Sequence, residues 1–355
     1  MTIALFVVIV LVQLVFIAGL VLLVLGARAK RRFFGRARVA RRPEVALAFT
    51  RWSLGEVPVL SVVEHLRSVT REAALEETLA AIANRVPAGR LDELSQVLRR
   101  ESWVEELLKG TSSRLWWHRL AAARALTVAG TEGDRAVLIR LLNDPLPAVQ
   151  IAASGAVERL ADRALIAGML DALPDRPPVV RRIQMRVLQS TWTQTGPLLL
   201  ERLARPAGRA QLVIWISLAE LSGDPAAVAA AAAFVNHPEM EVRVAVAKVL
   251  MHYFHPSTPD SLATLLRDAE WPVRAAAART AGTLRNARLV PVLRAAIADP
   301  AWWVRFRAAL SLAQLDEPGR SALRDAAAGP DRFAREMASM VSGLSDGGVL
   351  ELAEN

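Results

Sequence analysis

Two stretches of the chain decide its fold, DAEWPVRAAA at residues 268–277 and DPAWWVRFRAA at residues 299–309. They start at an interval of 299 − 268 = 31 and share an Asp, a Trp three positions later, a Val-Arg pair and small residues after that pair. A signature that returns at a fixed interval indicates a repeat protein, in which each repeat is one supersecondary unit.

The Val-Arg pair extends this interval along the chain. Its four copies begin at positions 180, 242, 273 and 304. The same spacing reaches positions 118, 149, 211 and 335. We call these eight positions the anchors, and they are separated by seven equal intervals. Three positions after the anchor the residues are mainly Ala or Ile, with Arg307 as the exception, and eight positions after it they are mainly Leu, Ala or Val. These positions form one buried face of a first helix, and apolar residues 24 positions after the anchor mark a second. The anchor valines are Val180, Val242, Val273 and Val304.

Two polar residue types also recur at fixed offsets from the anchors, and we call each set of residues at one offset a column. Five positions before the anchor, an Asp is expected to accept hydrogen bonds from the free N–H groups at the start of the first helix, an N-cap worth about 0.5–2 kcal/mol. One position after the anchor, an Arg is suited to a carboxylate of the same or the adjacent unit. Because each role is repeated, we expect both columns to be structural rather than catalytic. The columns are Asp144, Asp175, Asp268 and Asp299, and Arg181, Arg243, Arg274 and Arg305.

The pattern D-x-x-W-x-V-R-x-x-A-A resembles the HEAT repeat, in the short form found in phycobilisome-lyase-like proteins, here of a membrane-anchored bacterial type. The resemblance covers about residues 112–345. It implies an all-α fold, a right-handed α-solenoid of helical hairpins. It says less about function, because the family includes scaffolds, transport factors and a few enzymes.

The beginning of the chain is strongly apolar. Residues 3–26 contain Gln13 as their only strongly polar side chain. A helix of this length extends roughly 36 Å, enough to cross a hydrocarbon core of about 30 Å. The length of the stretch and the lack of a preceding Lys or Arg favour a transmembrane anchor, residues 1–26, over a cleavable signal peptide.

A basic juxtamembrane segment, residues 27–42, follows with eight positive side chains and no acidic one. The positive-inside rule then predicts an inner-membrane, single-pass protein with its N-terminus outside and its C-terminal domain cytoplasmic. The alternative is the same solenoid in the periplasm. Part of the segment is either a membrane-surface stretch or a solvated flank of the predicted transmembrane helix. The predicted membrane-surface residues are Arg28, Lys30, Arg31, Arg32, Phe33, Phe34, Arg36 and Arg38.

Three further segments complete the predicted organisation. Residues 43–111 read as helical but do not follow the interval, so we expect degenerate repeats or an N-terminal cap. Residues 112–345 form the repeat solenoid, and residues 346–355 are expected to be a flexible C-terminal tail.

Catalytic motifs are absent from the sequence. It contains no P-loop, no dinucleotide-binding glycine pattern, no G-x-S-x-G and no Cys. His252 and His255 are spaced i, i+3, but no carboxylate stands beside them, which favours packing at a helix end over a metal site. With a net charge of 9 − 8 = +1 outside the basic segment, residues 43–355 are poorly suited to nucleic acid. We expect no cofactor, no metal, no nucleic acid and no small-molecule substrate.

The tryptophans give the best indication of a binding surface. Trp116, Trp271 and Trp302 stand two positions before an anchor, where we expect them to pack against the neighbouring unit. Trp117 and Trp303 follow two of them and are the predicted protein interface. The second helices are expected to line the concave face.

These observations predict a membrane-tethered, non-catalytic scaffold that binds a protein partner on the cytoplasmic side. The resemblance suggests a membrane glycosyltransferase or an envelope signalling protein as that partner. The alternative is a HEAT-like enzyme, of the bilin lyase type or the DNA glycosylase type.

Overall fold

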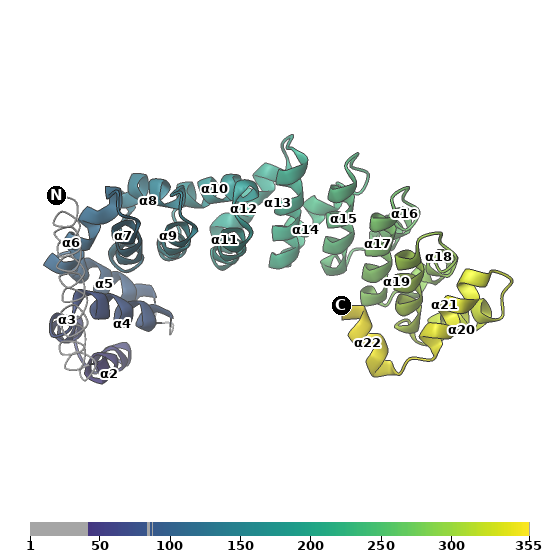
Figure 1. The fold of residues 1–355 in the computed structure, drawn as a ribbon, viewed down its shortest axis with the longest axis horizontal. Helices are drawn as coiled ribbons and strands as arrows, with labels where there is room; N and C mark the ends of the chain where they lie inside the picture. Colours follow the sequence, from purple (N-terminus) through teal and green to yellow (C-terminus); the bar gives the residue numbers. More distant parts are fainter. Residues whose placement is uncertain (1–41, 84–85, 87, 355) are drawn as a thin grey trace, which may run out of the picture. The chain divides into compact units, whose positions relative to one another are not determined.

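The structure is a computed structural model that describes residues 42–83, 86 and 88–354. In this part of the chain every regular element is a helix and no strand occurs, which confirms the all-α prediction. The described residues divide into two compact units, one ending at Leu160 and the other beginning at Ala161. Figure 1 labels the helices of each unit.

The first unit contains eight α-helices and two short 3₁₀ turns among its described residues. Their bounds are α2 (Arg42–Ser53), α3 (Val59–Arg67), α4 (Arg71–Ala83), α5 (Ala88–Leu98), α6 (Ser102–Leu108), η1 (Lys109–Ser112), α7 (Trp116–Ala129), η2 (Glu132–Asp134), α8 (Arg135–Leu142) and α9 (Pro147–Leu160).

Helices α2–α6 pack around an apolar core whose largest member is Trp52, 1% exposed. The same core includes Ala125 and Val128 of α7, the first helix of the periodic region. Residues 43–111 therefore cover the apolar face that α7 would otherwise expose, although they do not follow the repeat interval.

The second unit contains the remaining helices. Their bounds are α10 (Arg163–Ala172), η3 (Leu173–Asp175), α11 (Pro178–Ser190), α12 (Trp192–Leu203), α13 (Arg209–Ser222), α14 (Pro225–Ala232), α15 (Met240–Val249), η4 (Leu250–His252), α16 (Thr258–Leu265), α17 (Trp271–Leu284), η5 (Ala287–Leu289), α18 (Val290–Ala296), α19 (Trp302–Ala313), α20 (Asp316–Ala327), α21 (Arg332–Ser342) and α22 (Asp346–Glu354).

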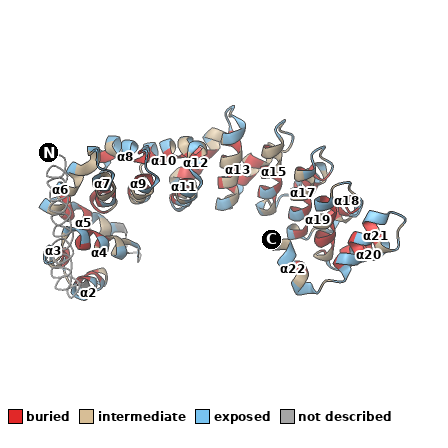
Figure 2. Ribbon diagram, viewed as in Figure 1, coloured by how far each residue is buried: buried red, intermediate tan, exposed pale blue. Residues whose placement is uncertain are grey.

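The eight anchors fall near the starts of eight helices, α7, α9, α11, α13, α15, α17, α19 and α21, which we call the first helices. All four anchor valines are fully buried. Figure 2 shows buried residues where neighbouring helices face each other and exposed residues on their outer sides. The repeat thus buries one stripe of each first helix against its neighbours, because a single helical hairpin cannot cover its own apolar face.

Small residues let adjacent first helices approach closely. The Oγ1 of Thr280 in α17 donates a hydrogen bond of 2.7 Å to the carbonyl of Ala247 in α15. One period later, the Oγ of Ser311 in α19 donates one of 2.6 Å to the carbonyl of Ala278 in α17. Between α17 and α19, a Cβ added at Gly282 would lie 2.6 Å from the Ser311 hydroxyl. Only hydrogen fits at this position.

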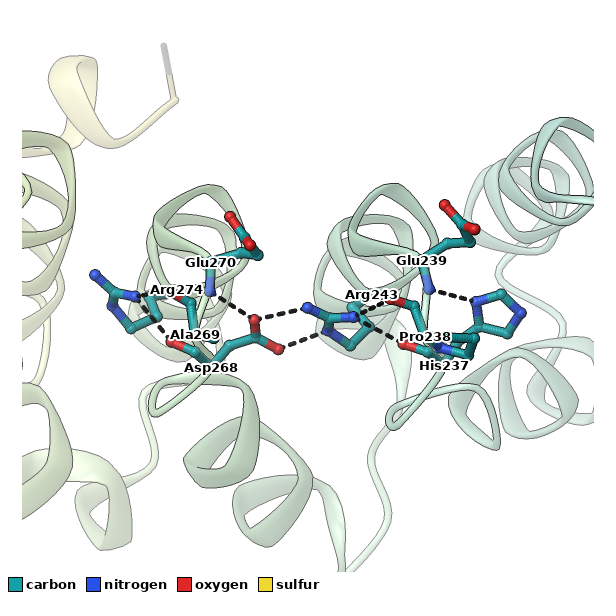
Figure 3. Close-up of polar contacts among 8 residues, drawn as sticks. All are labelled: His237, Pro238, Glu239, Arg243, Asp268, Ala269, Glu270 and Arg274. Atoms are coloured by element: carbon teal, nitrogen blue, oxygen red, sulfur yellow. Dashed lines mark hydrogen bonds and ion pairs between the residues drawn. The ribbon is translucent and has the colours of Figure 1, made fainter.

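The two polar columns join consecutive repeats (Figure 3). Arg243 donates through Nε and Nη2 to the carboxylate of Asp268 at 2.6 and 2.9 Å, and its Nη1 donates to the carbonyls of His237 and Pro238. Arg274 pairs with Asp299 in the same way, at 2.7 and 2.9 Å. In both pairs the Asp belongs to the repeat that follows the Arg, so the carboxylate that the Arg needs comes from the adjacent repeat.

In the first unit the same pair forms between Arg119 and Asp144, at 2.6 and 3.0 Å. We call these Arg–Asp pairs between consecutive repeats the ladder. It is incomplete elsewhere. A proline takes the place of the paired Asp in two repeats, Pro206 in the case of Arg181 and Pro330 in the case of Arg305. The guanidinium of Arg305 lies over the ring of Phe333 instead, 4.7 Å from its centre.

The predicted N-cap role of the Asp column is wrong. The N-cap of α17 is Glu270, and Asp268 accepts from the backbone N–H of Glu270 at 2.9 Å, in the turn before the helix. Asp144 and Asp299 bind the N–H two residues ahead in the same manner. The helix begins too late in the chain for these carboxylates to cap it, and Asp175 is exposed at the end of η3.

Burial by itself would raise the pKa of the Asp268 carboxyl. The hydrogen bonds from Arg243 and from the Glu270 N–H, together with the charges of Arg243 and Arg274, outweigh burial and hold this pKa below its ordinary value. The ionised carboxylate is therefore stabilised in the folded chain. This contribution is present above the pKa of the unfolded chain and is lost as the pH falls through the lowered pKa.

The localisation prediction is corrected. No helix in residues 42–83, 86 and 88–354 is long and apolar enough to cross a bilayer, so the structure does not support a single-pass inner-membrane protein. The predicted anchor at residues 1–26 and the predicted membrane-surface residues from Arg28 to Arg38 lie outside the described residues.

The C-terminal residues also differ from the prediction. Residues 346–354 form helix α22 instead of a flexible tail. Val349 is buried, α22 packs against α19, and Arg307 of α19 donates a hydrogen bond of 2.9 Å to the carbonyl of Leu352. These contacts stabilise the final segment as a helix.

Replacing Asp268 with Ala is expected to lower the free energy of unfolding by about 2 kcal/mol at pH 7, because the charged hydrogen bonds to Arg243 are lost. The difference should shrink as the pH falls, since protonation removes the same interaction from the unmodified protein. Urea unfolding at a series of pH values measures both effects. The control is Asp260→Ala, which breaks an exposed pair with Arg288 and should cost no more than about 0.5 kcal/mol. Equal losses in the two variants would contradict the role of the ladder.

Replacing Gly282 with Ala is expected to destabilise the protein by about 1–3 kcal/mol, because the added methyl group forces α17 and α19 apart. The matched control is Gly168→Ala in α10, where nothing lies within 4 Å of an added Cβ. Removing that exposed helical glycine should stabilise the protein by about 0.5–1 kcal/mol. Thermal unfolding of both variants should give shifts of opposite sign, and a neutral Gly282→Ala would disprove the close approach.

Candidate binding groove on the second unit

A cavity of about 720 Å³ lies along the first helices of the second unit. We call it the groove. It crosses from α13 over α15 and α17 to α19, and α22 forms part of its wall. Its volume falls in the range of ligand-binding sites, roughly 300–1,000 Å³. The side chains that carry its chemistry are Glu220, Lys248, Trp271, Arg279, Trp303 and Arg307.

Two tryptophans provide the aromatic surface of the groove. Trp271 is 47% exposed and Trp303 is 51% exposed. Trp303 is held in place by Trp302, which meets it edge-on at 4.8 Å between ring centres and itself stacks on Phe306 at 4.9 Å. The column of Trp116, Trp271 and Trp302 was expected to pack into the neighbouring unit, but all three are 45–47% exposed. Large aromatic faces on a packed framework are typical of binding surfaces.

Basic side chains line the same groove at regular positions. Lys248 of α15 and Arg279 of α17 are one period apart, each at the same position relative to its anchor. Arg307 of α19 interrupts the column of small residues three positions after the anchor. Burial lowers the pKa of the Arg307 guanidinium, and the nearby charge of Arg279 lowers it further. The two guanidinium groups therefore repel each other across the groove.

Glu220 of α13 is the acidic group of the lining. Burial raises the pKa of its carboxyl, and the positive charges of Lys248, His252 and Arg279 only partly oppose this effect. The ionised form of Glu220 is thus less favourable in the folded protein than in water. When it is ionised, this carboxylate reduces the net positive charge of the groove.

Helix α22 forms one part of the groove lining. Leu350 and Ala353 contribute to the lining, and the hydrogen bond from Arg307 reaches the carbonyl of Leu352. A guanidinium of the groove therefore already binds the main chain of a helix.

The predicted interface residues lie in different units. Trp303 lines the groove, whereas Trp117 is half-exposed in the first unit, beside Trp116. An interface role for each stays a prediction. The pairs Arg243–Asp268 and Arg274–Asp299 lie between repeats, and no member of the Asp and Arg columns is part of the groove lining. Within the described ranges, no group of three or more His, Asp or Glu side chains is placed to hold a metal ion.

Apart from Trp303, the groove residues were not identified from the sequence as a binding site. The second helices were expected to line the concave face, and the groove lies on the first helices. Two signals were present in the sequence, namely the equivalent positions of Lys248 and Arg279 and the irregular Arg307. What could not be read from them is that three different columns converge on one cavity.

Comparison with known proteins identifies part of the fold. Residues 258–342, helices α16–α21, match the family model described as HEAT repeats, in agreement with the resemblance seen in the sequence. No curated protein matches the chain.

Three solved structures are similar to parts of the chain. YibA of Escherichia coli is 12% identical, with 71% of this chain and 96% of that chain covered and a TM-score of 0.38. The CpcE–CpcF complex of phycocyanin lyase from Nostoc sp. PCC7120 is 16% identical, with 66% and 94% covered and a TM-score of 0.32. Human deoxyhypusine hydroxylase in complex with glycerol is 19% identical, with 73% and 98% covered and a TM-score of 0.28.

Replacing Glu220 with Gln is expected to stabilise the protein at pH 7, because an ionised, partly buried carboxylate is removed. The raised pKa means that the folded chain holds the proton more tightly than the unfolded chain. The gap between variant and parent should therefore close as the pH falls through the raised pKa towards about 4. Urea unfolding between pH 8 and pH 4 measures this, with Glu158→Gln, at an exposed position of α9, as the control. A variant less stable than the parent at pH 7 would show that Glu220 is held by favourable ion pairs.

Proposed function

We propose that the protein is a non-catalytic scaffold whose groove binds a protein partner. The observation that supports this most directly is the pair of half-exposed tryptophans, Trp271 and Trp303, in one open cavity. Tryptophan and arginine are enriched among the residues that dominate binding energy at protein interfaces, and both types face this groove.

The repeat framework suits such a role. Stacked helical hairpins present extended surfaces whose shape is fixed by the contacts between neighbours. The ladder from Arg243 to Asp299 and the hydroxyl bonds between first helices hold α15, α17 and α19 in register. The tryptophans and basic side chains therefore stand on a rigid support, which reduces the entropy lost on binding.

The groove lining favours recognition over catalysis. It presents aromatic faces, guanidinium groups and an ammonium group, which bind anions and apolar side chains. Thr280 has a hydroxyl at the lining, but that hydroxyl donates to the carbonyl of Ala247 and is committed to helix packing. We therefore favour the scaffold over the enzyme alternatives of the bilin lyase and DNA glycosylase types.

The experiment is affinity capture with the intact protein, followed by binding of each captured partner in purified form. The double variant Trp271→Ala, Trp303→Ala is expected to weaken the specific complex by roughly tenfold or more, because truncation of central aromatic side chains typically has effects of this size. Capture also tests the partners that the resemblance suggests, a membrane glycosyltransferase or an envelope signalling protein.

The control is Trp117→Ala, which removes an equally exposed tryptophan from the first unit and should leave affinity unchanged. A purified partner that binds the parent and the groove variant equally would contradict the proposal. So would a partner whose binding depends on Trp117 alone.

A further inference from the structure

We infer that the groove takes an acidic peptide segment of the partner, with carboxylates on Lys248, Arg279 and Arg307 and apolar side chains on Trp271 and Trp303. This inference rests on the proposed function and specifies the chemistry of the occupant.

The charge of the lining supports an acidic occupant. The lining includes four basic side chains, at positions 248, 279, 285 and 307, and one carboxylate, Glu220, so its formal charge is 4 − 1 = +3. Residues 43–355 as a whole carry only 9 − 8 = +1. The positive charge is thus a local property of the groove, and it complements a cluster of carboxylates.

The guanidinium group of Arg307 lies in an environment that an anion would improve. Arg279 disfavours the charged form of Arg307 and, after burial, contributes to the lowered pKa of that group. A carboxylate placed near Arg307 would stabilise its positive charge. Arginine is well suited to this task, because its planar donors match the two oxygens of a carboxylate.

The aromatic wall indicates a peptide rather than a small anion. Trp271, Trp303 and Leu350 give the groove an apolar surface beside its cations. An inorganic anion would leave this surface in water, whereas a segment with alternating acidic and apolar side chains would cover it. Arg307 already binds a main-chain carbonyl of helix α22, which is itself a segment of this kind with the sequence DGGVLELAE.

Nucleic acid fits these features less well. Binding to a phosphate backbone depends on many basic contacts along an extended track. Here the basic groups are gathered in one cavity instead of along a track. Nucleic acid is therefore an outcome that the experiment must exclude.

The probe is a fluorescein-labelled helical peptide, four turns long, of Leu and Glu at helical spacing, with a second peptide in which Gln replaces every Glu. Fluorescence anisotropy with the intact protein measures their dissociation constants. We expect the Glu peptide to bind at least tenfold more tightly than the Gln peptide. Arg279→Gln should weaken the Glu peptide about tenfold.

Two further variants make the result specific. Arg267→Gln removes an exposed positive charge of the α16–α17 connection, where the guanidinium hydrogen-bonds to the Ala263 carbonyl, and should leave binding unchanged. Glu220→Gln removes the competing carboxylate and should strengthen binding of the Glu peptide severalfold. A misfolded protein could not produce this gain, so the gain separates recognition from loss of structure.

The inference is overturned if the two peptides bind equally, if Arg279→Gln and Arg267→Gln have the same effect, or if a labelled single-stranded oligonucleotide of similar length binds more tightly than the Glu peptide. It also fails, with the proposed function intact, if a captured partner depends on Trp271 and Trp303 but is insensitive to Arg279→Gln. If no captured partner depends on the groove tryptophans, the proposed function itself fails.

Discussion

The bidentate pair between an Arg of one repeat and an Asp of the next sets the register of α15, α17 and α19, the helices that carry most of the groove. A helical hairpin of this size cannot bury its own apolar stripe, so it must stack on its neighbours. Apolar stacking alone is non-directional and would tolerate sliding. The pairs Arg243–Asp268 and Arg274–Asp299 fix the register, because each Arg also holds two carbonyls of the turn before its own helix.

The register between successive first helices determines which side chains line the groove. Lys248 and Arg279 occupy the same position in successive repeats, so a fixed offset between α15 and α17 places their side chains along one face. The close approach at Gly282 brings Arg307 of α19 to the same face. Glu220 and α22 then limit the charge and the extent of the surface. The proposed recognition surface therefore follows from the architecture of the repeats.

Much of the fold could be predicted, because the repeat period appears in the sequence itself. Buried anchors such as Val273 and the all-α class follow directly from it. The role of Asp268 could not be predicted, since a carboxylate near a helix start suits an N-cap and an ion pair equally well. Helix α22 was missed because its stability comes from contacts with α19, distant in the sequence. The groove was missed for a similar reason, as the convergence of Arg307, Lys248 and Trp271 is a property of packing.

In the proposed function, the first helices of the second unit form the recognition surface. Photo-cross-linking with a benzophenone-bearing acidic peptide, followed by mass spectrometric mapping of the adducts on the intact protein, tests it most directly. We expect adducts within residues 271–285, which are α17 and its C-terminal end, and within residues 303–307 of α19. Adducts confined to the second helices α16 and α18 would contradict it.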